Sequence, residues 1–163
     1  MMRGIPGAGK STVTRWLSEN FRGTAVHSTD AYHMLGDYYV YQHDKVAEYH
    51  NKNFTAFTKS CRAGKSLIVV DNTNIWPHLY GPYVGTAKAC GYKVLEIKFS
   101  LLREAWCIHN VPEDVVERMR TALKTYRELL GADYRLLINK SESLERVFHR
   151  LRNLILTIKR YGV

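Results

Sequence analysis

Residues 4–11 read Gly-Ile-Pro-Gly-Ala-Gly-Lys-Ser, a complete G-x-x-x-x-G-K-[ST] pattern. Its glycines let successive backbone N–H groups point inward at phosphate oxygens, and the helix expected from Lys10 to Asn20 aims its positive end at the same place. We expect Lys10 to reach the β- and γ-phosphates of a nucleotide and the Ser11 hydroxyl to bind Mg²⁺. The residues expected to contact the nucleotide are Gly4, Pro6, Gly7, Ala8, Gly9, Lys10, Ser11 and Thr12. A glycine-rich loop with a surface lysine is the simpler alternative.

Only Met1, Met2 and Arg3 precede this loop. A loop of this type normally follows a central buried strand of about five residues. The sequence therefore predicts either a chain that starts inside a longer natural sequence, which we favour, or a very short central strand and a weaker sheet. In the first case, a few apolar residues added upstream should raise the thermal stability.

Strands and helices are expected to alternate after the loop. Residues 66–74, SLIVVDNTN, place four consecutive aliphatic residues between turn formers, which is typical of a strand buried on both faces. Further strands are expected at 24–28 and 92–99. Helices are expected from a cap at Asp44 to about Arg62, from Pro77 to Gly91, from Pro112, and from about Ser143 with an apolar stripe of Leu144, Val147, Phe148, Leu151, Leu154, Ile155 and Ile158. This alternation predicts a parallel α/β sheet flanked by helices.

Length and composition predict a single domain over residues 1–163. The chain has 45% apolar and 24% charged residues, which argues against disorder, and it lacks an apolar run long enough for a membrane helix. Its three cysteines, an odd number without paired spacing, are expected to be reduced thiols. We therefore expect no membrane association and a cytoplasmic, or alternatively nuclear, location. The oligomeric state is left open.

The net charge of +9 is unevenly distributed. Residues 1–117 hold 13 basic and 11 acidic side chains, whereas residues 118–163 hold 11 basic and 4 acidic ones. Excess positive charge favours a polyanionic partner. The basic helical part, residues 121–163, has two interpretations: a solvated face over a core-facing stripe, or a track for nucleic acid or a partner protein.

Two carboxylates follow predicted strands. Asp30 comes after the strand at 24–28, at the edge of the sheet where ligands bind, and it can accept a proton from a hydroxyl acceptor. Asp71 ends the aliphatic strand and could hold Mg²⁺ through water. The alternative for each residue is a helix cap or a turn carboxylate.

Five short motifs occur in a specific order: RGIPGAGKST at 3–12, HSTDAYH at 27–33, YVY at 39–41, VVDNTN at 69–74 and HNVP at 109–112. Together they resemble the polynucleotide-kinase-type P-loop family, which includes the kinase domain of phage-type 5′-polynucleotide kinases and the kinase-like domain of NEDD4-binding proteins. The resemblance covers roughly residues 3–120. It implies a three-layer, kinase-type P-loop NTPase fold with a lid near 100–120, and ATP, or GTP, and Mg²⁺ as cofactors.

The same resemblance implies transfer of the γ-phosphate to the 5′-hydroxyl end of RNA or DNA. On it, Asp30 matches the general base, His33 lies where phage-type enzymes carry an arginine that grips the substrate phosphate, and Asn72 and Thr73 match a substrate-contacting pair. Ser11 and Asp71 would manage Mg²⁺, and Lys10 would act on the transferring phosphate.

The lid departs from the family pattern. Trp106 occupies the position of a lid arginine that neutralises charge on the transferring phosphoryl group. Arg103, or Arg118 and Arg120, could substitute for it. Loss of such an arginine lowers the rate about 10³- to 10⁵-fold. Two alternatives to a polynucleotide kinase therefore stay open: a kinase of a small hydroxylated metabolite, and a nucleotide-binding module that has lost catalysis.

Tyrosines gather after the proposed base. Tyr32, Tyr38, Tyr39 and Tyr41 could stack on a terminal base. The alternative is that Tyr39 and Tyr41 only pack a loop onto the sheet.

Overall fold

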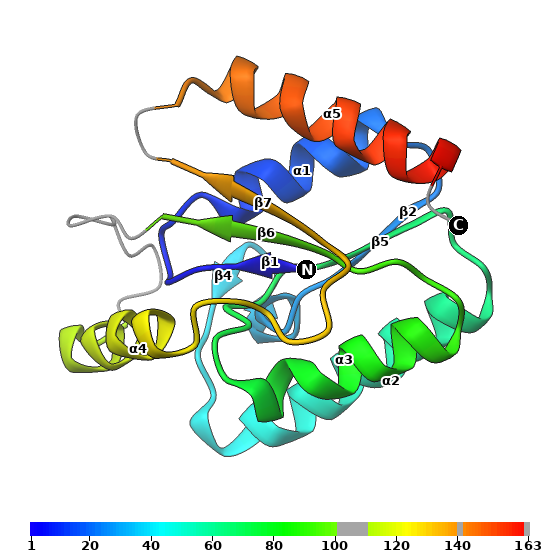
Figure 1. The fold of residues 1–163 in the computed structure, drawn as a ribbon. Coiled ribbons are helices and arrows are strands. Elements are labelled where there is room, and N and C mark those ends of the chain that lie inside the picture. Colours follow the sequence, from blue (N-terminus) through cyan, green and yellow to red (C-terminus); the bar gives the residue numbers. More distant parts are fainter. Residues whose placement is uncertain (101–110, 140–141, 162–163) are drawn as a thin grey trace.

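The computed structural model describes residues 1–100, 111–139 and 142–161, which form an α/β fold of three layers (Figure 1). Helices α1 and α5 cover one face of the central strands, and α2 and α3 cover the other. The strands are β1 (Met2–Arg3), β2 (Thr24–His27), β3 (Met34–Leu35), β4 (Tyr38–Tyr39), β5 (Leu67–Val70), β6 (Leu95–Phe99) and β7 (Tyr134–Ile138). The helices are α1 (Lys10–Asn20), α2 (Val46–Arg62), α3 (Pro77–Ala89), α4 (Glu113–Thr125) and α5 (Leu144–Tyr161), with 3₁₀ turns at Asp30–His33 and His43–Lys45.

The parallel strands form two separate paired sets. Strands β1, β6 and β7 make a three-stranded parallel sheet, in which Met2 lies beside Ile97 and Leu95 beside Tyr134. Strands β2 and β5 pair in parallel with Thr24 beside Leu67. Strand β1, at the edge of the three-stranded set, has two residues.

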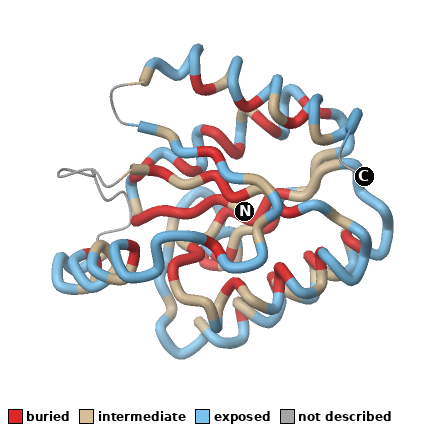
Figure 2. Tube along the Cα trace, in the orientation of Figure 1, coloured by how far each residue is buried: buried red, intermediate tan, exposed pale blue. Residues whose placement is uncertain are grey.

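The core consists of two apolar clusters that share strand β5. One cluster joins β1, β5, β6 and β7 to α1, α4 and α5, and includes Leu17, Val69 and Leu151. The other joins β5 to α2 and α3, and includes Phe57 and Tyr83. Figure 2 shows buried residues concentrated in the strands and on the inward faces of the helices. An apolar cavity of about 90 Å³ lies between the clusters and is lined by residues of both, which is consistent with the divided sheet.

The expected helices and strands are all present; α1 has the expected bounds, and the others have shorter or shifted ends. The expected cap at Asp44 is wrong, because Asp44 lies inside a 3₁₀ turn and α2 begins at Val46 after Lys45. The strand expected at 92–99 begins only at Leu95. The stripe on α5 buries Val147, Leu151 and Ile155, but Leu144 is exposed because it begins the helix.

Three strands were not predicted from the sequence. Strand β7 follows Gly131, and strands β3 and β4 form a small antiparallel hairpin in which Leu35 lies opposite Tyr38. Among the described residues, Cys61 and Cys90 form no disulfide bond. Within the described part of the chain, none of the helices combines the length and the apolar character needed to span a membrane.

Candidate active site

The phosphate-binding loop connects β1 to α1. Gly7 and Gly9 have φ angles of 77° and 89°, which side chains other than glycine rarely adopt. Gly4 packs against Phe99, where an added Cβ would lie 3.2 Å from the Cβ of Phe99. The first turn of α1 has no acidic residue and no side-chain cap, so its backbone N–H groups and its positive end are directed at the loop. This arrangement suits a bound phosphate.

Lys10 lies over this loop. Its ammonium group donates a hydrogen bond of 2.9 Å to the carbonyl oxygen of Ile5, and the residue as a whole is buried. The contact holds the positive charge at the cradle, from which it can move to a phosphate oxygen.

Asp71 follows β5 and faces the start of α1. Asp71 is 6% exposed, and among the described residues its Oδ1 atom has no hydrogen-bond partner. Burial raises the pKa of Asp71, while the Ser11 hydroxyl and the charge of Lys10 oppose this rise. A buried carboxylate oxygen beside a hydroxyl is a donor set that Mg²⁺ accepts. Ser11 and Asp71 therefore fit the ion.

The turn after β5 joins the ends of three strands. Asn72 Oδ1 accepts a 2.9 Å hydrogen bond from the backbone N–H of Thr29, which follows β2. The carbonyl of Thr73 accepts one of 3.1 Å from the N–H of Gly4, the first residue of the loop. Asn74, in a left-handed conformation with φ 48°, donates through Nδ2 to the carbonyl of Met2 at 2.7 Å. These contacts fix Asp71, the loop and the end of β2 relative to one another.

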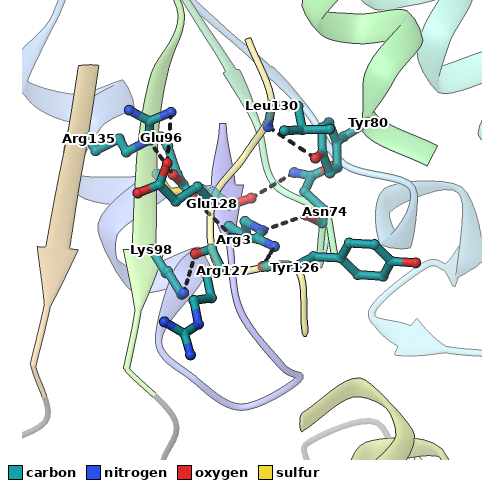
Figure 3. Close-up of polar contacts among 11 residues, drawn as sticks. Arg3, Asn74, Tyr80, Glu96, Lys98, Tyr126, Arg127, Glu128, Leu130 and Arg135 are labelled. Carbon is teal, nitrogen blue, oxygen red and sulfur yellow. Dashed lines mark hydrogen bonds and ion pairs between the residues drawn. The ribbon is translucent and has the colours of Figure 1, made fainter. Parts of the chain in front are cut away.

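Arg3 supports this turn from below (Figure 3). Its side chain is fully buried, donates from Nε to the carbonyl of Asn74 at 3.1 Å, and forms an ion pair of 2.9 Å with Glu96. It also donates to the carbonyl of Tyr126, in the segment after α4. The second carboxylate oxygen of Glu96, Oε2, forms an ion pair of 3.5 Å with Nε of Arg135. A buried network therefore holds β1, β6, the turn and the segment after α4 together.

Asp30 begins the 3₁₀ turn after β2 and is exposed to solvent. It lies close enough to influence two neighbours: its charge raises the pKa of Asp71 and also that of His50, although burial dominates in both and lowers the pKa of His50 overall. The structure thus brings Asp30, Asp71 and the phosphate loop to one edge of the sheet.

His33 is 4% exposed and lies among aromatic rings. Its Nδ1 accepts a 3.3 Å hydrogen bond from the backbone N–H of Gln42, and its ring stacks on Tyr41 at 5.1 Å and meets Tyr49 edge-on at 4.8 Å. Only Nε2 is left for a contact with a substrate phosphate, so that expected role stays a proposal. The residue has a clear packing role.

Some expected lid residues cannot be placed. Arg103 and Trp106 lie outside the described residues. Of the alternatives to Arg103, Arg118 pairs with Asp114 at 3.2 Å, and Arg120 pairs with Glu113 at 2.8 Å. Both guanidinium groups are therefore engaged in ion pairs, that of Arg118 in an exposed position and that of Arg120 in a largely buried one.

The basic charge of the last third of the chain is partly neutralised. Arg135 pairs with Glu96 and Glu128, and Arg150 pairs with Glu142 at 2.6 Å. Phe148 on α5 stacks on Trp16 of α1 at 4.6 Å, so the apolar face of α5 is directed at the core. These contacts favour the interpretation of α5 as a solvated helix over a core-facing stripe.

Sequence reasoning missed Arg3, Asn74 and Glu96. Arg3 and Glu96 are charged residues within expected buried strands, and such residues need a partner of opposite sign. The sequence alone therefore indicated that Arg3 and Glu96 need partners of opposite charge. The partner of each could be identified only from the pairing of β1 with β6.

The phosphate loop, the carboxylate that ends β5 and the parallel three-layer architecture define a P-loop nucleotide-binding domain with a kinase-type fold. A family model described as an AAA domain matches residues 1–126, well over half of the chain, and the chain belongs to this family. It is also 29% identical over 156 residues to human NEDD4-binding protein 2. That alignment covers 90% of this chain and 8% of the relative, so the chain spans only a small part of it. These findings support the kinase-like P-loop family without singling out the phage-type kinases.

Replacing Asp71 by asparagine is expected to weaken Mg²⁺-dependent ATP binding about 10- to 100-fold, the range found when groups that orient a metal are lost. The carboxylate is buried beside Ser11, and its charge would attract the ion. Calorimetric titration of ATP at several Mg²⁺ concentrations checks this. An unchanged dependence on Mg²⁺ would contradict the assignment. Asp133→Asn, on the loop before β7, is the matched control.

The free energy of unfolding is expected to fall as the pH is lowered through about 6.5. Burial lowers the pKa of His27 and of His50 in the folded protein, so below pH 6.5 the unfolded chain binds more protons. The raised pKa of Asp71 has the opposite effect at more acidic pH. There the folded protein binds more protons than the unfolded chain, so lowering the pH increases the free energy of unfolding. Urea unfolding at pH 7.5 and 5.5 measures the slope. His27→Gln should reduce the dependence of the unfolding free energy on pH, whereas His78→Gln, at an exposed position, should leave it unchanged.

Proposed function

We propose that this chain is an ATP-dependent 5′-hydroxyl polynucleotide kinase. The observation that carries the proposal is the gathering of three groups at one sheet edge: the phosphate loop after β1, Asp30 after β2 and Asp71 after β5. Hydrogen bonds from Thr29 to Asn72 and from Gly4 to Thr73 fix their relative positions. A donor phosphate site, a metal site and a carboxylate base are the parts that phosphoryl transfer requires.

In this proposal the Asp30 carboxylate accepts the proton of the terminal 5′-hydroxyl. The 5′-oxygen forms a bond to the γ-phosphorus, the bond from that phosphorus to the β–γ bridging oxygen breaks, and ADP leaves with the electron pair. Lys10 and the loop N–H groups hold the phosphate oxygens and stabilise their charge. Ser11 and Asp71 would hold Mg²⁺, which would further neutralise the phosphates.

The exposure of Asp30 supports a polymer as acceptor. A base at the bottom of an enclosed pocket would admit only a small molecule, whereas Asp30 lies at the surface, where the end of a long strand can approach. The resemblance of the motifs at 27–33 and 69–74 to polynucleotide kinases supports the same choice.

A panel of acceptors with γ-labelled ATP tests the proposal. The panel contains 5′-hydroxyl RNA and DNA oligonucleotides, nucleosides and small sugar alcohols. We expect label in the oligonucleotides. Label in small alcohols alone would identify a metabolite kinase, and ATP binding without transfer to any acceptor would identify a nucleotide-binding module. Either result overturns the proposal.

A further inference from the structure

An open groove of about 450 Å³ runs along α2, beginning at the 3₁₀ turn that carries Asp30. Tyr32 of this turn lines it together with side chains of α2, among them Lys52 and Lys59. The ring of Tyr32 stacks on the ring of Tyr49 of α2, with 5.9 Å between their centroids, and this contact holds the turn against the helix. The groove is therefore continuous with the edge of the sheet at which Asp30 lies. We refer to it below as the α2 groove.

Helix α2 runs away from this edge. Near its start, Nδ1 of His50 lies 3.5 Å from the hydroxyl of Thr29, the residue before Asp30. Near its end, the hydroxyl of Ser60 lies 3.0 Å from Nε2 of His27, the last residue of β2. Because β2 runs towards the edge that holds Asp30, α2 runs in the opposite direction. A nucleic-acid strand with its 5′ end at Asp30 can therefore continue along the helix.

The α2 groove has two lysines on one side of the helix. Lys52 and Lys59 are seven residues apart, so they lie nearly in one row, two turns or about 10 Å from each other. Both are exposed to solvent. A groove with cations spaced along it suits the phosphates of a single strand, which such grooves bind without regard to sequence.

Glu48 is the single acidic residue of α2 and also lines the groove. It forms an ion pair of 2.6 Å with Lys52, in which both side chains are 53% exposed. An ion pair this exposed contributes little to stability, so Lys52 can exchange the carboxylate for a phosphate. The carboxylate of Glu48 would then repel the phosphates.

We propose that the α2 groove binds the phosphates that follow the 5′-terminal nucleotide of the substrate, with Lys52 and Lys59 as its cations, so that longer oligonucleotides are better acceptors than dinucleotides. The proposal rests on the proposed kinase function and adds a second contact surface for its substrate. Binding through phosphate contacts weakens as the salt concentration rises.

Transfer of label from γ-labelled ATP to 5′-hydroxyl oligonucleotides of two to ten nucleotides, at several salt concentrations, tests this. The wild-type KM should fall with increasing length and become constant once the strand extends past Lys59. Lys59→Gln should raise the KM of the longest acceptor about two- to fivefold, the energy of an exposed ion pair. It should also lower the slope of log KM against log salt concentration by about 0.7. The dinucleotide, too short to reach Lys59, should keep its KM, and kcat should stay unchanged.

Glu48→Gln should shift the KM of the longest acceptor in the opposite direction, because it removes the repulsion and frees Lys52 for a phosphate. A lower KM is a result that loss of a merely structural contact would not produce. An unchanged or higher KM would contradict the proposal.

Arg152→Gln is the matched control, since it makes the same change in net charge at an exposed position of α5, on the opposite face of the central strands (Figure 1). It should change no KM. If the KM is independent of length, or if Lys59→Gln and Arg152→Gln behave alike, the α2 groove does not bind the substrate and the kinase function stands. If the wild type labels no oligonucleotide of any length, the kinase function fails and this proposal fails with it. Circular dichroism of each variant excludes a folding defect as the cause.

Discussion

Asp30→Asn is expected to reduce phosphoryl transfer to a 5′-hydroxyl end about 10²- to 10⁴-fold while ATP affinity stays within about twofold. A positioned general base contributes that range to the rate, and asparagine keeps the shape of the side chain but cannot accept the proton. Asp30 is exposed and begins a short turn, so its replacement should leave the fold intact. Single-turnover transfer and calorimetric ATP binding measure the two quantities separately.

Asp37→Asn is the control for this prediction. Asp37 is an exposed carboxylate in the turn of the neighbouring β3–β4 hairpin, so the variant makes the same change in charge a few residues away. It should transfer label at the wild-type rate. If Asp30→Asn retains transfer, Asp30 is not the base; if both variants lose it equally, the effect is one of overall charge.

Arg3→Met is expected to lower the free energy of unfolding by about 3–5 kcal/mol. The change leaves the buried carboxylate of Glu96 without its closest cationic partner and removes the hydrogen bonds to the carbonyls of Asn74 and Tyr126. The double variant Arg3→Met/Glu96→Leu should be more stable than Arg3→Met alone, since it removes the uncompensated charge. Urea unfolding at pH 7.5 measures all of these values.

Arg135→Met is the matched control, because Arg135 pairs with the same carboxylate from an exposed position (Figure 3). It should cost less than about 1 kcal/mol, as surface ion pairs do. A cost for Arg3→Met as small as that for Arg135→Met would show that the buried network does not hold β1 in place.

The sequence predicted the parts of the fold that rest on local patterns. Few local structures fit the glycine and lysine spacing of the phosphate loop, Gly4 to Ser11. The same is true of the four consecutive aliphatic residues at 67–70, which indicate a buried strand. The β3–β4 hairpin was missed because its strands have two residues each, too few for a periodic pattern. Strand β7 was missed because its sequence, Tyr-Arg-Leu-Leu-Ile, does not alternate and only one of its residues, Leu136, is buried.

The candidate site was predictable in its residue types but not in its connections. The order of motifs indicated Asp30 and Asp71, and parallel pairing of β2 with β5 brings both to one edge. The burial of His33 depends on Tyr41 and Tyr49, which approach it from two different elements. Contacts of this kind are set by tertiary packing, so no local pattern in the sequence reveals them.

We propose that the edge formed by the phosphate loop, Asp71 and Asp30 transfers the γ-phosphate of ATP to a terminal 5′-hydroxyl. The most direct measurement incubates the chain, Mg²⁺ and γ-labelled ATP with two oligonucleotides that differ only in carrying a 5′-hydroxyl or a 5′-phosphate. We predict that label enters only the 5′-hydroxyl strand and is removed by a phosphatase specific for terminal phosphates. ATP binding with no label in either strand would contradict this account.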